Sequence, residues 1–423
     1  MNNANKISLF IAGQFMSQIG SAITGFAFGI FIFKIDKHVT DLALLYFFQI
    51  LPAFLLPLPL GSLVDMFSKK KIIILADIIT ILGLLFLMLK ACNHNLNHVD
   101  LYGYVIVCSI FSTLQGIAIT AFVGSAVTSE ERVKFNALLT LKQSIPRMIG
   151  PLFAGLFASQ FNITMLIFVD IVCTLFAIGM TYWISEPTQI NKVSASWGGI
   201  LNYKSTWRYL VCKPQLLWSS SCLMLSIITV SMMGVYIIPL ALHESTTTTA
   251  GKIIAMGGLG SIFSGLLVSY FRLNNLKIDS FIPISLALQG GIVFFGSLLH
   301  SVIIMGAVLF LYFFINPFQR GCSYALWQNS TEELCYGKIF AIKSVLLQSA
   351  GLITFMFCGP LADKVLDPLM RHYGHHGIHL ILSSVYGVGK DRGMDVALGL
   401  AGLAQCCFGM WIYLRRKLVF KVS

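Results

Sequence analysis

Six charged residues lie within long apolar stretches of the chain. They are Asp77, Lys142, Arg147, Asp170, Arg320 and Lys343. An ionisable side chain at the centre of a bilayer costs at least about 2.5 to 3.5 kcal/mol on insertion scales, so such residues are typical of ion and substrate pathways. The two acids are therefore candidates for proton exchange, and the four cations are candidates for binding anions.

Arg147 and Asp170 are expected at similar depth, because the two helices that would carry them form a tight hairpin around Asn162. A helix rises about 1.5 Å per residue, which places the two side chains within about 8 Å of each other along the helix axes. An acid beside a cation can bind or release a proton when its access to water changes. A purely structural ion pair is the alternative interpretation.

The first apolar stretch bears on the charge of a substrate, because it carries no acid and only the neutral Gln14 and Gln18 as amides. The four cations favour an anionic or neutral polar substrate over a cationic one. A carboxylate-bearing metabolite, such as a siderophore, can be held by an arginine through two parallel hydrogen bonds. As an alternative, Arg320 and Lys343 extend to lipid headgroups at the membrane surface.

Composition places these residues in a membrane, since 57% of the 423 residues are hydrophobic and 11% are charged. Soluble domains have about 25% charged residues. A spanning helix needs roughly 20 apolar residues, and that pattern recurs along the chain. The predicted spans are 7–34, 42–64, 72–91, 102–127, 134–159, 162–184, 214–242, 250–272, 279–299, 301–326, 335–362 and 393–414. We predict an all-α integral membrane fold of twelve transmembrane helices in two six-helix halves, residues 1–184 and 214–423, joined by a cytoplasmic linker, 185–213.

A short charged segment between two apolar runs, Gly61 to Lys71, contains Asp65 and three consecutive lysines, Lys69, Lys70 and Lys71. The positive-inside rule puts this tight loop in the cytoplasm. Both termini are then cytoplasmic, and the inner loops carry about twice as many lysines and arginines as the outer ones. The pattern G-x-L-x-D returns at 359–363 with the opposite sidedness, which inverted three-helix repeats would produce.

Other function classes lack their motifs. The net charge of +12 is spread over loops beside apolar spans, which argues against a nucleic-acid partner and for contact with anionic lipid. Most of the ten cysteines lie in apolar runs, so no disulfide framework is expected. No phosphate-binding G-K-[ST] loop or hydrolase motif is present, which excludes an ATP-driven pump and predicts no enzyme activity and no cofactor.

A histidine-rich segment lies in the predicted outer loop between the last two spans. It contains His372, His375, His376 and His379. That spacing would place the imidazoles on one face of a helix and allow metal binding. Gly374 and Gly377 argue against such a helix, and solvated loop histidines are the favoured interpretation.

Twelve helices with G-x-L-x-D-x-x-x-K-K-K after the second resemble a major facilitator superfamily transporter. The loop matches at Gly61, Leu63, Asp65 and 69–71, and departs at Met66 and Ser68. Further stretches resemble the macrolide and multidrug efflux type of bacterial transporter. These are 20–27, 132–137, 325–328, 337–341 and 359–368. The resemblance places the chain in a bacterial inner membrane, as a monomer.

The resemblance also implies gating residues. In the family, the carboxylate at the position of Asp65 meets the N-terminus of the eleventh helix and holds the inner gate shut. The alternative interpretation is that Asp65 and the three lysines only set the topology of the chain in the membrane. Gly150 and Pro151 resemble the antiporter signature G-P-x-x-G-G, with Ala154 in place of a glycine. Plain helix packing is the alternative there.

The activity implied is alternating access by rocking of the two halves, driven by an ion gradient or by the substrate's own gradient. Our preferred prediction is proton-coupled export of a small amphipathic or anionic compound. An importer or facilitator of a polar metabolite is the second hypothesis. A membrane sensor or scaffold that transports nothing is the alternative from another class.

Overall fold

The computed structural model is helical in most of the residues that it describes. The described residues are 3–56, 60, 63–64, 66–126, 145–146, 149–150, 152–154, 162–184, 213–244, 247–270, 278–299, 301–329, 336–370, 383–389 and 392–419. The main helices are α1 (Asn3–Asp36), α2 (Val39–Leu55), α4 (Lys69–Cys92), α5 (His98–Ala126), α7 (Ile163–Tyr182), α10 (Pro214–Glu244), α11 (Thr247–Tyr270), α12 (Ile278–Ser297), α13 (Val302–Asn329), α14 (Tyr336–Pro360) and α17 (Arg392–Val419). A π-helix, η3 (Leu361–Leu366), and the short α15 (Asp367–Met370) continue α14.

Ten of the described helices are long and apolar enough to cross a membrane, and α2 is a shorter apolar helix of 17 residues. The all-helical membrane fold is therefore confirmed, and the predicted count of twelve is roughly consistent with it. Within the predicted second span, 42–64, α2 ends at Leu55, and Leu60, Leu63 and Val64 are again helical, whereas 57–59 and 61–62 lie outside the described residues. The predicted span 134–159 lies largely outside the described residues.

The chain divides into two compact units. Unit 1 comprises Met1–Lys37, Leu44–Ala195 and Thr246–Ala255, and unit 2 comprises His38–Ala43, Ser196–Ser245 and Met256–Ser423. The division at Ala195 falls within the predicted linker, whereas the N-terminal end of α2 belongs to unit 2 and the start of α11 to unit 1. The predicted domain bounds remain a prediction.

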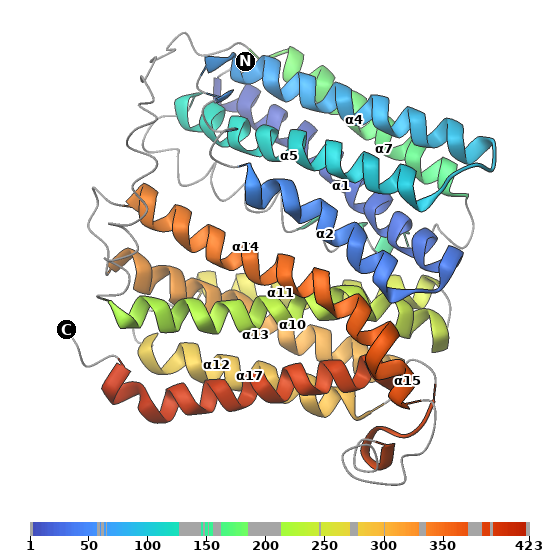
Figure 1. The fold of residues 1–423 in the computed structure, drawn as a ribbon. Coiled ribbons are helices and arrows are strands. Elements are labelled where there is room, and N and C mark those ends of the chain that lie inside the picture. Colours follow the sequence, from blue (N-terminus) through green and yellow to red (C-terminus); the bar gives the residue numbers. More distant parts are fainter. Residues whose placement is uncertain are drawn as a thin grey trace. The chain divides into compact units, whose positions relative to one another are not determined.

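In unit 1, α1 lies against α7, and α4 lies against both α5 and α7 (Figure 1). Small residues bring these helices close together, as is usual where lipid surrounds a bundle. A Cβ atom at Gly13 would stand 2.7 Å from the side chain of Met180. At one end of the unit, Phe10 and Phe122 pack with ring centroids 5.4 Å apart in an apolar cluster.

In unit 2, α12 lies against α17 and α13, and α10 lies against α14 (Figure 1). Glycines again set the closest approach, since a Cβ atom at Gly402 would stand 2.7 Å from the backbone nitrogen of Phe294. A second apolar cluster, which includes Leu216, Leu286 and Trp327, fills one end of the unit.

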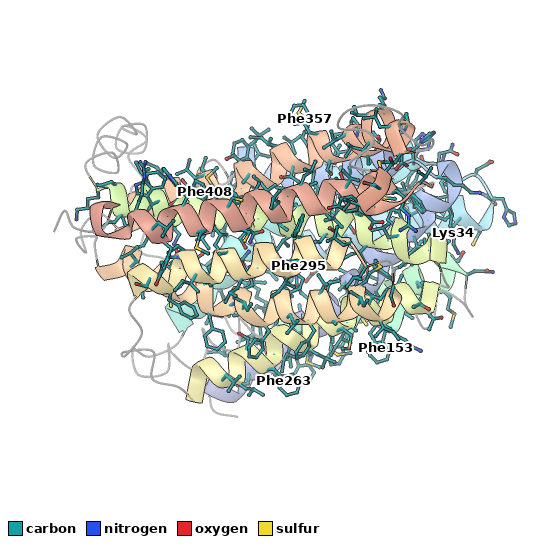
Figure 2. The ribbon with its side chains drawn as sticks, turned by 90° about the horizontal axis from the view of Figure 1, so that it is seen from below. Lys34, Phe153, Phe263, Phe295, Phe357 and Phe408 are labelled. Carbon is teal, nitrogen blue, oxygen red and sulfur yellow. The ribbon has the colours of Figure 1, made fainter. Side chains whose placement is uncertain are left out.

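Large apolar side chains also cover the outside of the helices. Phe263, Phe295 and Phe357 point away from their helices in Figure 2, and each is more than half exposed. A soluble protein seldom exposes apolar patches on this scale. These faces suit the hydrocarbon of a bilayer, which explains why apolar residues surround the whole circumference of several helices.

Candidate functional site

Asp170 lies in the interface between α1 and α7 and is 1% exposed. Its Oδ1 atom accepts hydrogen bonds from the hydroxyls of Ser21, at 3.2 Å, and Thr174, at 3.4 Å. Its Oδ2 atom is buried and has no hydrogen-bond partner among the described residues. A Cβ atom at Gly20 would stand 2.7 Å from Oδ1, so the absence of a side chain there gives the carboxyl group its place.

Hydroxyl groups extend along this interface on both sides of the acid. Ser17, Ser21 and Thr24 are spaced by three and four residues, which places them on one face of α1. The hydroxyl of Thr24 donates to the backbone carbonyl of Leu166 at 3.4 Å. The hydroxyl oxygens of Ser17 and Thr174 lie 3.3 Å apart. These neighbours of the acid are uncharged hydroxyl groups that can each donate or accept a hydrogen bond.

Asp77 on α4 forms a second buried polar cluster in unit 1. Its Oδ2 accepts from the side-chain amide of Gln14 at 3.1 Å, and its Oδ1 accepts from that of Gln115 at 2.6 Å. Gln14 also contacts the hydroxyl of Thr181 at 3.4 Å. Both carboxylate oxygens therefore receive amide donors. Sequence reasoning selected Asp77 and Gln14 but missed Gln115 and Thr181, which a search for polar residues inside apolar helices would have found.

Several predicted site residues stay apart from these clusters. Gln18, on α1, is exposed. Lys142 and Arg147 lie outside the described residues, so the predicted pair between Arg147 and Asp170 remains a prediction.

Lys343 on α14 is buried in unit 2, at 1% exposure. Its Nζ atom lies 3.8 Å from the centre of the Tyr324 ring and 4.9 Å from that of Trp327. Aromatic faces attract a cation, and the attraction is strongest where water is excluded. The structure thus places Lys343 against aromatic rings inside the unit, whereas Arg320 is exposed on α13.

An uncharged polar cluster, which sequence reasoning missed, lies in the interior of unit 2. Its members come from α10, α12, α13 and α17, and they are Ser226, Thr229, Gln289, Tyr312, Asn316 and Gln405. Thr229 donates to Gln405 Oε1 at 2.6 Å, and Asn316 donates to the hydroxyl of Ser226 at 3.1 Å. The signal in the sequence is weak, because each residue stands alone in an apolar run.

The predicted gate is described only in part. Gly61, Asp65 and Pro151 lie outside the described residues. Lys70 donates to the backbone carbonyls of Tyr182 and Ile184, each at 2.7 Å, and so caps the C-terminus of α7. Lys69 is half-buried and Lys71 is exposed. Gly150 packs directly against Ala22 of α1.

The second copy of the G-x-L-x-D pattern forms a helix cap. Asp363 in η3 accepts from the backbone nitrogens of Val39, at 3.1 Å, and Thr40, at 2.8 Å, and from the Thr40 hydroxyl at 2.6 Å. These donors lie at the N-terminus of α2, where an anion is stabilised by unpaired N–H groups. This is the chemistry that the sequence predicts for Asp65 at the eleventh helix.

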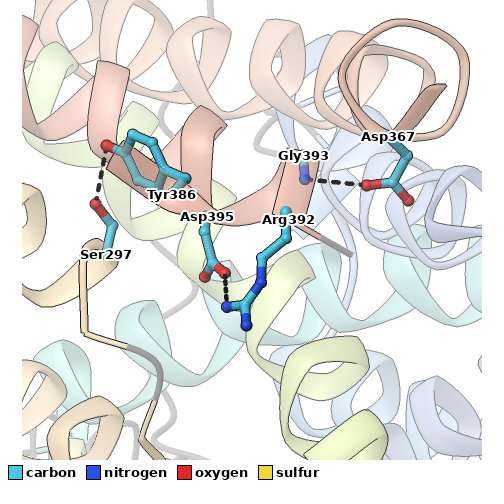
Figure 3. Close-up of polar contacts among 6 residues, drawn as sticks. All are labelled: Ser297, Asp367, Tyr386, Arg392, Gly393 and Asp395. Atoms are coloured by element: carbon cyan, nitrogen blue, oxygen red, sulfur yellow. Dashed lines mark hydrogen bonds and ion pairs between the residues drawn. The ribbon is translucent and has the colours of Figure 1, made fainter. Parts of the chain in front are cut away.

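The start of α17 is held by polar contacts within unit 2 (Figure 3). Asp367 accepts from the backbone nitrogen of Gly393 at 3.2 Å, and Arg392 pairs with Asp395 at 3.4 Å. Tyr386 lies with its hydroxyl 3.3 Å from that of Ser297, and burial raises the pKa of this tyrosine. The four histidines of the neighbouring loop lie outside the described residues. Within the described part of the chain, no group of histidine, cysteine and acidic residues is suited to hold a metal ion.

A family model for the major facilitator superfamily matches residues 10–355. The chain belongs to this superfamily. Its fold resembles the crystal structure of a bacterial homologue of the human lysosomal transporter Spinster, with a TM-score of 0.72, 12% identity and coverage of 99% of this chain and 97% of that one. It also resembles the nucleoside transporter NupG, with a TM-score of 0.74, 11% identity and coverage of 97% and 100%.

A bacterial homologue of the iron transporter ferroportin is similar too, with a TM-score of 0.71, 14% identity and coverage of 98% of this chain and 99% of that one. No curated protein matches the chain in sequence. Superfamily members of this kind carry small molecules across membranes, so the chain is a multi-pass membrane transporter and not an enzyme. Its structural relatives are transporters named for different substrates, and they show the fold alone.

Proposed function

We propose that this transporter exports a small amphipathic or anionic compound in exchange for protons, with Asp170 as the residue that binds the proton. The observation that carries the proposal is the environment of this carboxyl group, which is buried with one oxygen unpartnered among the described residues. Burying a charged carboxylate in such a place costs much more free energy than burying the protonated form. A change in access to water would therefore load and unload the proton.

The proposed charge of the substrate rests on the sequence, where lysines and arginines outnumber acids within the predicted spans. Lys343 is a buried lysine, and the buried polar residues described on α1, which are Gln14, Ser17 and Thr24, include no acid. An anion is the natural partner for a buried ammonium group. A carboxylate-type siderophore is one class of compound that fits these requirements.

Export, as opposed to import, is supported by the resemblance of five stretches to efflux-type transporters and by Gly150 in the antiporter-like signature. Gly150 packs against Ala22 of α1, the helix that carries Ser21 beside Asp170. We place the chain in a bacterial inner membrane as a monomer with both termini in the cytoplasm. Asp65, with the adjacent lysines, is the proposed inner gate.

One observation favours the second hypothesis, an importer or facilitator of a polar metabolite. The cluster around Gln289 and Gln405 contains only uncharged hydrogen-bonding groups. Such groups suit hydroxyl or amide groups of a neutral substrate. In that case Asp170 would be dispensable.

The two hypotheses separate in cells that lack the protein and in cells that carry wild-type protein, Asp170→Asn or the control Asp100→Asn. Asp100 pairs with Lys90 at a helix end, at 3.5 Å, away from the interface of α1 and α7. We expect wild type and Asp100→Asn to lower the internal level of at least one anionic metabolite, more strongly in acidic medium. Asp170→Asn should lose this effect. Equal metabolite levels in all strains would contradict export, and normal export by Asp170→Asn would contradict proton coupling.

A further inference from the structure

A cavity of about 740 Å³ opens in unit 1 beside the C-terminal ends of α1 and α4 and the N-terminus of α7. Binding pockets for small molecules have volumes of roughly 300 to 1,000 Å³ and mostly apolar walls with a few polar groups. This cavity has that character. Its walls include Ile30, Phe31 and Leu166, and its polar lining includes Lys34, His94 and Asn162.

The charge of the lining is positive. Lys34 lies in the last turn of α1, and the lining residues that the structure describes include no acid. Asp100, an acid on α5, is paired with Lys90. A ligand in this cavity would therefore meet apolar walls and one cation, with nothing among the described lining residues to repel an anion.

Unit 2 shows that such a cavity is not a general consequence of this helix packing. At the ends of α10, α12, α13 and α17, apolar side chains including Met233, Leu240 and Val308 leave a space of only about 50 Å³. That space includes the acid Asp395 and no lysine in its described lining. This space in unit 2 thus differs from the unit 1 cavity both in size and in the charge of its described lining.

We propose that the unit 1 cavity binds a small amphipathic anion, with its apolar body against α1, α4 and α7 and its carboxylate or sulfonate beside Lys34. This site is separate from Asp170 and does not depend on proton coupling. It does agree with the substrate class proposed above, since a compound of that class would have a binding place at this end of the unit.

The test uses Cys92, which lines the cavity and is exposed. Full-length protein is placed in phosphatidylcholine nanodiscs, and the rate of Cys92 modification by a maleimide is followed by mass spectrometry of its peptide. Octanoate is the probe, and octanol is the uncharged control of equal length. We expect octanoate to slow the modification several-fold more than octanol does.

Two pairs of variants locate the site. Lys34→Gln should weaken protection by octanoate roughly tenfold, because a charge-assisted contact is lost. Lys37→Gln, on an exposed lysine outside the lining, should leave protection unchanged. In calorimetric titrations, Cys92→Trp should lower octanoate affinity by filling the cavity, whereas Cys92→Ser should not.

Equal protection by octanoate and octanol would overturn the proposal, as would equal effects of Lys34→Gln and Lys37→Gln. A dependence of protection on anionic lipid would also contradict the proposal. If Cys92 is protected only when phosphatidylglycerol is added to the nanodiscs and octanoate has no effect, the cavity binds a lipid headgroup and not a small anion.

Discussion

The interface of α1 with α7 contains a carboxyl group, whereas the interface of α10 with α17 contains an amide. In the first, Asp170 accepts a hydrogen bond from the hydroxyl of Ser21 on α1 at 3.2 Å and has an oxygen unpartnered within the described part of the chain. In the second, Gln405 accepts from Thr229 of α10 at 2.6 Å and donates to Gln289 at 3.3 Å. Hydrogen bonds link the helices of each pair, but the carboxyl group of Asp170 can change its charge, whereas the amide of Gln405 cannot.

Burial and hydrogen bonding alone do not identify a residue that exchanges protons. Gln289 and Gln405 in the uncharged polar cluster of unit 2 are as deeply buried as Asp170, yet their amides cannot titrate. Asp77 adds a second contrast within unit 1, because amides donate to both of its oxygens. Such a carboxylate is satisfied as it stands, so we assign Asp77 a structural role and Asp170 the exchange of protons.

The largest effect is expected from closing the space beside Asp170. In Gly20→Val, the Cβ atom alone would stand 2.7 Å from Asp170 Oδ1 and 3.0 Å from Asp170 Cα, and the two methyl groups would add further contacts. Overpacking costs typically about 1 to 3 kcal/mol or more, so folded protein should fall sharply. Gly25→Val is the matched control, since nothing lies within 4 Å of its Cβ position. Equal yields and unfolding temperatures for the two variants would show that α1 does not need to approach α7 at Gly20.

A smaller effect is expected from removing the structural acid. Asp77→Leu leaves the amides of Gln14 and Gln115 without their acceptor, and a buried unsatisfied donor costs about 1 to 3 kcal/mol. The unfolding temperature in detergent should fall. Asp170→Leu should lower it less, because its weak contacts to Ser21 and Thr174 are with hydroxyls that can rotate to other acceptors. The reverse order would contradict the roles assigned to the two acids.

The smallest effect is expected in unit 2. Gln405→Leu removes one acceptor from Thr229 and one donor from Gln289, a loss of about 1 kcal/mol of unfolding free energy. Transport should keep its dependence on pH, because no titratable group is removed. A flattened pH profile for this variant, measured beside wild type, would show that the amide cluster takes part in coupling.

Much of the fold could be predicted from sequence, because a run of about 20 apolar residues has few alternatives in a bilayer. The predicted spans 72–91, 162–184 and 279–299 begin and end within a few residues of α4, α7 and α12. The end of α2 at Leu55 was not predicted, since the apolar residues that follow it extend the same pattern. The division of short segments such as 38–43 between units depends on tertiary contacts that no local pattern specifies.

The site could be predicted only where a residue is unusual on its own. Asp77, Asp170 and Lys343 are conspicuous as charges in apolar runs, and all three are buried. Gln115 and Gln405 stand out in the sequence only as polar residues within apolar runs, and their hydrogen-bond partners come from other helices. The sequence pattern also led to Asp363, but its partner, the N-terminus of α2, lies more than 300 residues away along the chain.

Infrared difference spectroscopy of the protein during a pH titration tests the central claim most directly. A protonated carboxyl group in an apolar site has a carbonyl stretching band that an ionised one lacks. We predict one such band that disappears as the pH rises, that is absent in Asp170→Asn, and that persists in Asp77→Asn. A band that survives in Asp170→Asn and is lost in Asp77→Asn would contradict the assignment of proton exchange to the interface of α1 and α7.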